Sequence, residues 1–353
     1  MTLLIKNGRI LDPANGTDRT GDLLIQGSKI VAAFEDKGGK QTVIDAQGKW
    51  VVPGLIDMHV HAREPGFEYK ETIATACEAA ANGGFTTIVT MPNTDPVCDT
   101  AALISAVYER ASRANGVTVY PMGAITKGLA GEELAEFGDM LRAGAVAVTD
   151  DGKGVMSSAL MRAALEYAQN FGLVVCAHCE DKHLAGKGLM HEGEMSSKLG
   201  MRAIPAVAES VMVARDIQLA EHTGGRYHVQ HISAAASLNL VRQAKKNGLA
   251  VTCEAAPHHW SLSDEALAGY NSNFKVNPPL RSQEHIRAIR RAFKDGTIDV
   301  IATDHAPHAE IDKKVEFDQA ANGIIGLETA LPLSLNLWRE GVLELLDLIA
   351  KLT

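Results

Sequence analysis

The feature that most constrains the fold is a regular alternation of short apolar segments with longer segments of helical spacing, which starts at Pro53. Eight segments have the length and composition of buried strands: 55–61, 86–91, 117–123, 145–149, 173–177, 227–231, 250–254 and 300–303. Seven segments between them have helical spacing: 71–82, 99–114, 132–143, 158–170, 207–222, 234–247 and 282–294. Parallel strands that alternate with helices eight times close into a barrel. The sequence therefore predicts an α/β fold, a (β/α)8 barrel of the TIM type.

The first 52 residues have a different pattern. Three strand-like runs, LLIKNGRIL, GDLLIQGSKIVAAF and QTVIDAQGKWVV, are separated by Gly, Asn and Asp turns, with no helical spacing between them. Such a pattern is typical of a small β structure. We therefore expect two domains: a β-sandwich-like subdomain over 1–52 and the barrel over 53–353, a length that one barrel commonly reaches.

Composition excludes several classes of protein. Hydrophobic residues make up 46% of the chain and charged residues 22%, which is typical of a globular protein. The formal net charge of −9 argues against a surface that binds nucleic acid. No apolar run approaches the roughly 18 residues of a membrane span, and the amino terminus is too short and too polar for a signal peptide. We therefore expect a cytoplasmic protein that acts on a small molecule.

The carboxyl ends of the predicted strands carry side chains that bind metals. In barrels of this type, functional residues gather at those ends. Four histidines and two aspartates follow five different strands: His59, His61, Asp151, His178, His231 and Asp304. Imidazole and carboxylate ligands suit Zn²⁺ and related divalent ions. Six ligands are too many for one tetrahedral ion, so we expect two ions that share a bridging carboxylate and a bridging hydroxide.

Seven motifs spread along the barrel region resemble the amidohydrolase superfamily and, within it, the class I dihydroorotases. They are HVHAREPGFEYKE, MPNTDP, TDDGKG, AHCED, QHIS, KVNPPLR and ATDHAPH. The resemblance implies a barrel with two zinc ions per subunit and the small β unit beside it. It assigns one ion to His59, His61 and Asp304, the other to His178 and His231, and the bridge to Asp151 together with a hydroxide.

The bridging position separates relatives within this superfamily. Dihydropyrimidinases, hydantoinases and many others carry a carbamylated lysine there, whereas this chain offers Asp150 and Asp151. Lys153 lies two residues further on, in an expected loop. Asp150 competes with Asp151, because a slip of one residue reverses which side chain of a strand faces inward. The resemblance favours Asp151.

An anionic substrate requires cationic and amide side chains near the metal ligands. Arg63, two residues after His61, could clamp a carboxylate through two parallel hydrogen bonds. Asn93 and Asn277 stand next to prolines in sequences typical of turns, and the resemblance assigns both to substrate binding. The full set expected to contact substrate is His61, Arg63, Asn93, Asn277, His308, Asn322 and Gly323. Three other histidines are expected to have a structural role or to support the metal ligands without binding the metal: His258, His259 and His305.

The segment that follows His308, AEIDKKVEFDQAANGIIG, is charged and then rich in glycine. By its composition it is a solvated surface loop. In the family, this region closes over the substrate and supplies backbone N–H groups, which here would come from Asn322 and Gly323. Relatives usually have a Pro-Phe-Gly-like run where this chain has Ala321-Asn322-Gly323, so we expect the packing of the loop to differ.

The resemblance implies the activity of a dihydroorotase, which reversibly cyclises N-carbamoyl-L-aspartate to L-dihydroorotate and water in de novo pyrimidine (UMP) biosynthesis. Asp304 is the expected general acid and base. One alternative is another cyclic amidase, such as an allantoinase, a hydantoinase or a dihydropyrimidinase. A second is a non-catalytic partner of aspartate transcarbamoylase, although inactive relatives lack part of the ligand set that is complete here. A homodimer and an association with aspartate transcarbamoylase are further expectations.

Family members continue beyond the last barrel helices and return to complete the small β unit. This sequence stops at LLDLIAKLT, inside an expected helix. We therefore expect residues 1–52 to lack some strand partners and to have exposed edges.

Overall fold

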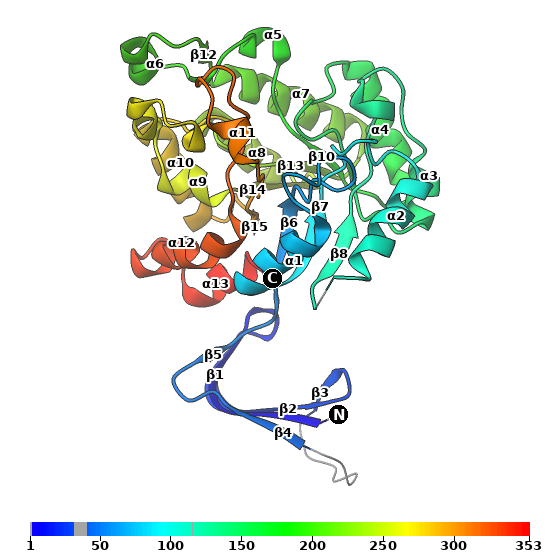
Figure 1. Ribbon diagram of the computed structural model, residues 1–353, viewed down its shortest axis with the longest axis vertical. Helices are drawn as coiled ribbons and strands as arrows, with labels where there is room; N and C mark the ends of the chain where they lie inside the picture. Colours follow the sequence, from blue (N-terminus) through cyan, green and yellow to red (C-terminus); the bar gives the residue numbers. More distant parts are fainter. Residues whose placement is uncertain (1, 32–40, 115) are drawn as a thin grey trace.

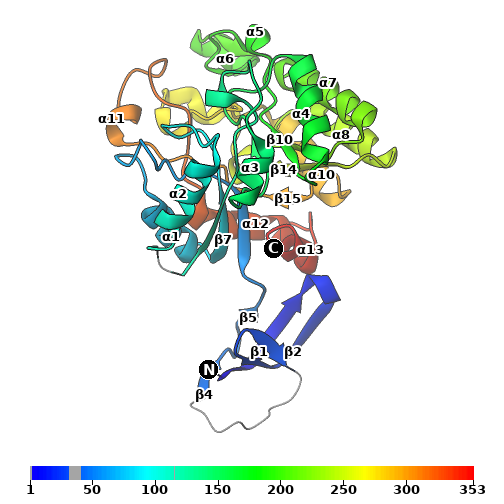
Figure 2. The same cartoon turned by 90° about the vertical axis from the view of Figure 1, so that its right-hand side faces the viewer.

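The structure is a computed structural model that describes residues 2–31, 41–114 and 116–353. A small β sheet extends from one end of a larger α/β barrel (Figures 1 and 2). The last part of the expected strand segment 21–34 lies outside the described residues.

The small sheet contains β1 (Thr2–Asp12), β2 (Thr17–Gln26), β3 (Lys29–Val31), β4 (Gln41–Asp45) and β5 (Trp50–Val51), and the 3-10 helix η1 (Pro13–Asn15) joins the first two strands. The strand order is β3-β2-β1-β4, and β5 also pairs with β1. β2 is antiparallel to β1, whereas β4 and β5 are parallel to it. Every residue of β4 is exposed. Ile30 and Val43 expose 68% and 54% of their surface, so this sheet buries little of its apolar surface.

The barrel contains eight strands at the eight predicted places: β6 (Leu55–Val60), β7 (Phe85–Thr90), β8 (Thr118–Pro121), β9 (Val148–Thr149), β10 (Val175–Ala177), β13 (Tyr227–Val229), β14 (Val251–Ala255) and β15 (Val300–Ile301). They pair in two parallel sheets, β6-β7-β8 and β9-β10-β13-β14-β15. Two isolated parallel bridges join these sheets, one between Gly123 and Val148 and one between Val60 and His305. The strands therefore form a ring, and the prediction of a (β/α)8 barrel is confirmed.

Helices surround the ring (Figures 1 and 2). The seven predicted helices are α1 (Ile73–Asn82), α2 (Ala101–Ala111), α3 (Phe137–Arg142), α4 (Ser158–Gln169), α7 (Val207–Thr223), α8 (Ala235–Lys246) and α10 (Gln283–Lys294). Two more lie in the last part of the chain, α12 (Leu327–Arg339) and α13 (Leu345–Ala350). None of the helices in the described ranges combines the length and hydropathy needed to cross a membrane.

The remaining elements are short. They are η2 (Lys127–Leu129), α5 (Lys182–Ala185), β11 (Met190–His191), α6 (Glu194–Leu199), β12 (Ala203–Ile204), α9 (Pro257–Ser261), η3 (Asp264–Gly269), η4 (Ser272–Phe274) and α11 (Glu310–Lys313). β11 and β12 form a separate two-stranded parallel sheet. Several of these short elements lie on the side of the barrel that faces away from the small sheet (Figures 1 and 2).

One predicted helix is shorter than its spacing indicates. We expected a helix over 132–143, but α3 begins only at Phe137. The preceding residues pair with an extended segment instead: the Lys127 N–H donates to the Glu133 carbonyl, and the Ala135 N–H donates to the Ile125 carbonyl. These backbone hydrogen bonds compete with the first helical turn, so tertiary pairing overrides the helical pattern there.

An apolar cluster inside the barrel lies directly beneath the carboxyl ends of the strands. It consists of Val89, Met91, Met122, Ala147 and Cys176, with Met58 and Val174 packed against it. Gln230 connects it to the polar rim, because its Nε2 lies 3.3 Å from the Met91 sulfur and 3.4 Å from His59 Nδ1. The barrel therefore presents polar side chains above a closed, apolar floor.

Candidate metal centre

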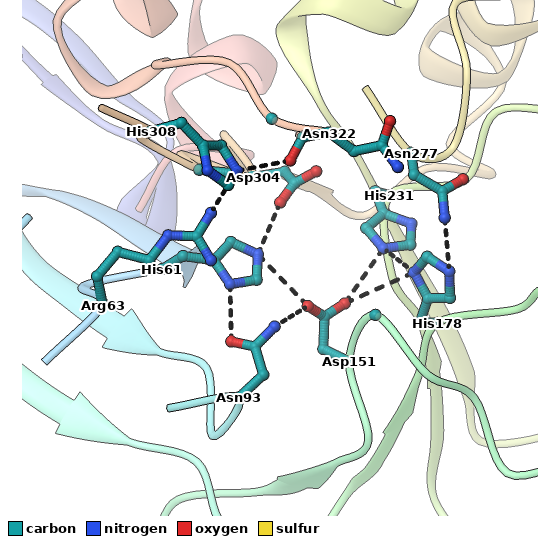
Figure 3. Close-up of a pocket in the computed structure, with 13 residues that line it drawn as sticks. His61, Arg63, Asn93, Asp151, His178, His231, Asn277, Asp304, His308 and Asn322 are labelled. Carbon is teal, nitrogen blue, oxygen red and sulfur yellow. Dashed lines mark hydrogen bonds and ion pairs between the residues drawn. The ribbon is translucent and has the colours of Figure 1, made fainter. Parts of the chain in front are cut away.

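The six candidate metal ligands lie together at the carboxyl ends of the barrel strands, and all six are buried. His59 is in β6, and the others follow β6, β9, β10, β13 and β15: His61, Asp151, His178, His231 and Asp304. Figure 3 shows these five around one cavity. His231 and Asp304 have φ angles of 30° and 50°. Such angles are rare outside glycine, and this kind of backbone strain is concentrated at functional sites.

Two groups of possible ligands share Asp151: one contains His59 and His61, and the other contains His178 and His231. Within each group the ligand atoms lie within 4.8 Å of one another. One Asp151 oxygen lies 3.5 Å from His59 Nε2 and 3.3 Å from His231 Nε2, and the other lies 3.4 Å from His61 Nε2. This carboxylate therefore stands between the two groups.

Asp304 lies beside the first group. Its Oδ1 is 3.1 Å from His61 Nε2 and 3.5 Å from His59 Nε2. Burial opposes the charge on this carboxyl, but His59 and His61 outweigh burial and hold its pKa below the usual range. Asp304 is therefore an ionised acceptor at the edge of the cavity.

The state of His59 fits a metal ligand. Its Nδ1 donates to Glu254 Oε1 at 2.5 Å, so in the neutral ring the lone pair belongs to Nε2. That buried nitrogen has no hydrogen-bond partner among the described residues, and it lies 3.5 Å from both Asp151 and Asp304. Burial disfavours a charge on His59, but Glu254 and the two aspartates outweigh it and hold the pKa of the imidazole well above its usual value. The same negative field favours a metal cation, so these residues can hold one.

Asp150 and Asp151 have different surroundings. Asp150 accepts hydrogen bonds from the Ile125 N–H at 2.8 Å, the Thr126 N–H at 2.9 Å and the Thr126 hydroxyl. These bonds turn it toward the loop after β8. Asp151 faces the four histidines, and Lys153 is exposed to solvent. The geometry thus brings Asp151, and neither of its rivals, between the two ligand groups.

Glu254 is part of this centre, although we did not single it out from the sequence. Besides His59, it accepts from His228 Nε2 at 3.2 Å and from the His231 N–H at 3.2 Å. It therefore orients ligands of both groups at once. The available signal was its position, because it is an acidic residue at the carboxyl end of the seventh predicted strand.

All seven expected substrate contacts line a cavity of about 180 Å³ in front of the ligands. Asn93 Oδ1 accepts from His61 Nδ1 at 2.9 Å, and its Nδ2 lies 3.5 Å from Asp151. Asn93 therefore orients two candidate ligands in addition to facing the cavity (Figure 3). Asn277 Nδ2 lies 3.5 Å from His178 Nε2, and its buried Oδ1 has no partner in the part of the chain that is described.

Arg63 and His308 form one side of the cavity, and Arg63 supplies its positive charge. Arg63 donates from Nε to the Pro307 carbonyl at 3.1 Å, and its Nη2 lies 3.2 Å from His308 Nε2. That same Nε2 lies 2.8 Å from the Asn322 carbonyl, and Lys70 Nζ lies 3.3 Å from His308 Nδ1. Because Lys70 can only donate, the imidazole proton belongs on Nε2 and is donated to Asn322. Because a protonated Nε2 cannot accept a hydrogen bond, Arg63 Nη2 remains available to donate to a ligand.

The backbone N–H groups of the loop residues Asn322 and Gly323 differ in their hydrogen bonding. The Gly323 N–H donates to the Lys275 carbonyl at 2.9 Å, so the expected contact of this N–H with substrate is not available in this conformation. The Asn322 N–H has no hydrogen-bond partner among the described residues. A side chain cannot replace Gly323, because a Cβ there would lie 2.4 Å from the Ala306 carbonyl oxygen.

The three histidines expected to be structural lie outside this cavity. His305 Nδ1 accepts from the Gly326 N–H at 3.1 Å, and its Nε2 lies 3.3 Å from Glu71. His259 Nε2 donates to the Pro278 carbonyl at 3.0 Å. Burial lowers the pKa of His258 to about 4, so this ring is neutral at physiological pH.

Known proteins resemble this chain in sequence and in fold. A family profile described as "Dihydro-orotase-like" matches residues 48–237. The dihydroorotase of Pelotomaculum thermopropionicum is 55% identical over an alignment that covers all of this chain and 83% of that protein. The dihydroorotase of Anaeromyxobacter dehalogenans is 53% identical, with 99% of this chain and 82% of that protein covered. The solved L-hydantoinase (dihydropyrimidinase) from Arthrobacter aurescens has a TM-score of 0.86 at 26% identity and covers 99% of this chain and 80% of its own.

The barrel, together with a buried histidine–aspartate cluster able to hold a metal ion, defines a cyclic amide hydrolase of the amidohydrolase superfamily. Within that class, the identity to curated relatives over nearly the whole chain is decisive. The chain belongs to the dihydroorotase family.

Proposed function

We propose that this protein is a zinc-dependent dihydroorotase, which interconverts L-dihydroorotate and N-carbamoyl-L-aspartate in de novo pyrimidine biosynthesis. The observation that carries the proposal is the Asp151 carboxylate between two pairs of buried histidines. A carboxylate in this position is what the resemblance to class I dihydroorotases implies, whereas hydantoinases are expected to carry a modified lysine. The exposed position of Lys153 supports the same choice.

The donor set suits two zinc ions. His59, His61 and Asp304 would hold one ion, His178 and His231 the other, and Asp151 would contribute to both. When bound, divalent ions of this kind polarise a carbonyl group and lower the pKa of a water molecule, which makes that water a nucleophile near neutral pH.

The other side chains of the cavity orient the substrate. The guanidinium of Arg63, beside the neutral His308, would bind the ring carboxylate through parallel hydrogen bonds. Asn277, with its unpaired Oδ1, would accept from a ring N–H. Holding the ring in this way makes the reaction at its amide carbon effectively intramolecular.

Asp304 is the proposed general base and acid. In hydrolysis, water adds to the ring amide carbon while Asp304 accepts a proton from that water. The carbon–nitrogen bond then breaks, and Asp304 returns the proton to the departing nitrogen. In the biosynthetic direction, Asp304 takes a proton from the carbamoyl nitrogen, which attacks the side-chain carboxyl group of the aspartate moiety. Asp304 then returns that proton to the departing hydroxyl group, which leaves as water.

The experiment that tests this function follows L-dihydroorotate by ultraviolet absorbance, with and without a chelator. We expect hydrolysis that the chelator abolishes, and no hydrolysis of dihydrouracil, hydantoin or allantoin, which lack the ring carboxylate that Arg63 would bind. Turnover of hydantoin or dihydrouracil in preference to dihydroorotate would instead support a sister amidase, the function named for the Arthrobacter structure.

The role of Asp304 has its own test. The Asp304→Asn variant keeps the shape of the side chain but cannot accept the proton, so kcat should fall by roughly 10²–10⁴-fold. An Asp304→Asn protein with its metal content and its turnover both intact would refute the assignment. A homodimer, an association with aspartate transcarbamoylase and a cytoplasmic location rest on the resemblance alone, and sedimentation with and without the transcarbamoylase would test the first two.

A further inference from the structure

Two buried lysines lie under the loop that borders the substrate cavity. We call this loop, residues 309–325, the lid. Lys275 precedes the turn that contains Asn277, and Lys313 is the last residue of α11 within the lid. Only 5% of Lys275 and 9% of Lys313 are exposed, and neither forms an ion pair with a carboxylate of the described chain. Burying an unpaired ammonium is costly, so such a group requires full hydrogen bonding.

Lys275 directs its ammonium group to three carbonyls of the lid. Its Nζ donates to the carbonyls of Phe317 at 2.7 Å, Asp318 at 3.2 Å and Ala320 at 2.6 Å. The same Nζ lies 5.3 Å from the centre of the Phe317 ring. An ammonium has three donors, so these three carbonyls of the lid use every donor of Lys275.

Lys313 holds the carbonyls on both sides of Asn322. Its Nζ donates to Ala321 O and to Gly323 O, each at 2.9 Å, and it lies 3.4 Å from the Lys275 carbonyl. The Asn322 carbonyl is held by His308, and the Gly323 N–H by Lys275. The backbone around Asn322 is therefore fixed at four points, and its own N–H is the one group left over in this stretch.

The direction of that free N–H follows from the planarity of the peptide. In a trans peptide the carbonyl and the following N–H point to opposite sides, so the bond from Lys313 to Ala321 O turns the Asn322 N–H away from Lys313. Lys313 lines a separate cavity of about 380 Å³ on the other side of Gly323. Asn322 lines the substrate cavity (Figure 3). Lys313 and Asn322 thus line different cavities, and Gly323 between them lines both.

We propose that Lys275 and Lys313 are positioning residues for the reaction: their ammonium groups hold the lid carbonyls so that the Asn322 N–H is presented to an oxygen of the bound substrate. We call the hydrogen bonds from the two lysines to the lid carbonyls the clamp. The identity of the substrate rests on the proposed function, whereas the clamp does not. Neither lysine touches the reacting atoms. Their contribution is therefore to substrate binding and not to proton transfer.

The matched test compares Lys313→Met with Lys314→Met. Methionine keeps the length and the apolar stem of lysine but removes the donors. Lys314 is the adjacent lysine, its side chain is 73% exposed, and it pairs with Glu310 on the surface. For Lys313→Met, we expect KM for dihydroorotate to rise about tenfold, the effect of losing one good hydrogen bond to a charged ligand, while kcat changes by less than about threefold. For Lys314→Met we expect both constants to be unchanged.

Backbone hydrogen exchange of residues 317–323 gives a second readout that needs no substrate. Loss of the clamp should speed exchange across this stretch in Lys313→Met and in Lys275→Met, but not in Lys314→Met. Should Lys313→Met fail to fold, Lys275→Met must show both the rise in KM and the faster exchange.

Three outcomes decide the matter. A Lys313→Met protein with the wild-type KM and wild-type lid exchange would overturn the proposal. Equal falls in kcat and metal content would also overturn it, because they would indicate a general structural role. If the wild-type protein fails to hydrolyse dihydroorotate, the proposed function fails, and the exchange measurement still decides whether the lysines clamp the lid.

Discussion

Asp150 and Asp151 are neighbours in the chain whose carboxylates face different partners, and this makes them a matched pair for mutation. Asp151→Asn should lose bound metal and essentially all activity, because both ligand groups share that carboxylate. Asp150→Asn should keep its metal but lose roughly 1–3 kcal/mol of unfolding free energy, because three hydrogen bonds converge on a buried charge. Elemental analysis and chemical denaturation of both variants measure these effects. The opposite pattern would mean that Asp150 is the bridge.

Glu254 should tune metal affinity without binding the metal. Glu254→Gln weakens the acceptor that holds His59 and His228, so metal affinity should fall by roughly 10–100-fold in a chelator competition. Glu209 offers a matched control, because it is also buried and hydrogen-bonded, but to Ser233, Ala234 and Arg281. Glu209→Gln should cost stability and leave metal affinity unchanged. Equal loss of metal in both variants would show that the effect is general destabilisation.

At the level of single residues, the sequence was sufficient to predict that the six candidate ligands lie together, because the carboxyl ends of all barrel strands meet at one face of the barrel. It could not decide between Asp150 and Asp151. β9 is only two residues long, and Asp151 lies in a turn where strand alternation no longer applies. Glu254 was not singled out, because apart from its place at the carboxyl end of a predicted strand it has no distinctive spacing from other candidate residues. Its importance depends on His59 and His231, which are distant in sequence and adjacent only in the fold.

At the level of elements, Asp216 ties α7 to β13 in a way that depends on pH. It accepts from Arg215 Nε at 2.8 Å and from the Tyr227 hydroxyl at 3.0 Å. Burial raises its pKa from 3.8 to about 6, although Arg215 and Tyr227 oppose the shift. The folded chain therefore keeps a proton that the unfolded chain releases. This stabilisation is complete below about pH 4 and is lost as the pH rises through about 6.

Asp216→Asn cannot ionise, so it should not lose stability as the pH rises. The difference in unfolding free energy between the variant and wild type should therefore shift in favour of the variant by roughly 2–3 kcal/mol from about pH 4 to about pH 7.5. Urea denaturation of both proteins at the two pH values measures this difference. A difference that stays constant with pH would show that Asp216 has no raised pKa.

The elements differ in how well their pattern predicts them. The strands and the long helices were predictable, because their apolar spacing records which face is buried. The start of α3 was not, because residues 133–135 form backbone bonds to 125–127 that no local pattern indicates. The lid was expected to be a solvated loop on composition alone. Its two buried lysines carry the same charge as surface lysines, and only the fold shows that they bind backbone carbonyls.

For the whole molecule, metal removal should affect stability as well as activity. A ligand that binds only the folded state stabilises it by roughly 3–4 kcal/mol when its concentration is 100 to 1,000 times its dissociation constant. Chelation should therefore lower the melting temperature by several degrees and abolish turnover, and added Zn²⁺ should restore both. Asp151→Asn should show no such shift. An unchanged melting temperature of the wild type after proven metal loss would contradict a site built into the fold.

The overall architecture was predictable because strands that alternate with helices form a parallel sheet covered on both faces, and eight such units are the number that closes into a barrel. How the ring closes was not. Closure depends on two isolated bridges, between Gly123 and Val148 and between Val60 and His305, which involve residues at strand ends. Such contacts depend on the tilt of every strand, and no single segment of sequence records that tilt.

The small sheet lies beyond one end of the barrel, whereas α11 of the lid lies toward the other end (Figures 1 and 2). The substrate cavity, lined by residues that follow the carboxyl ends of the strands, is therefore on the side away from the small sheet. An enzyme attached to a solid support through β1 would therefore turn its lid toward the solution. Substrate could then reach the cavity and product could leave it without passing the support. We therefore expect that a reporter protein fused to the small sheet would leave the cavity open to substrate.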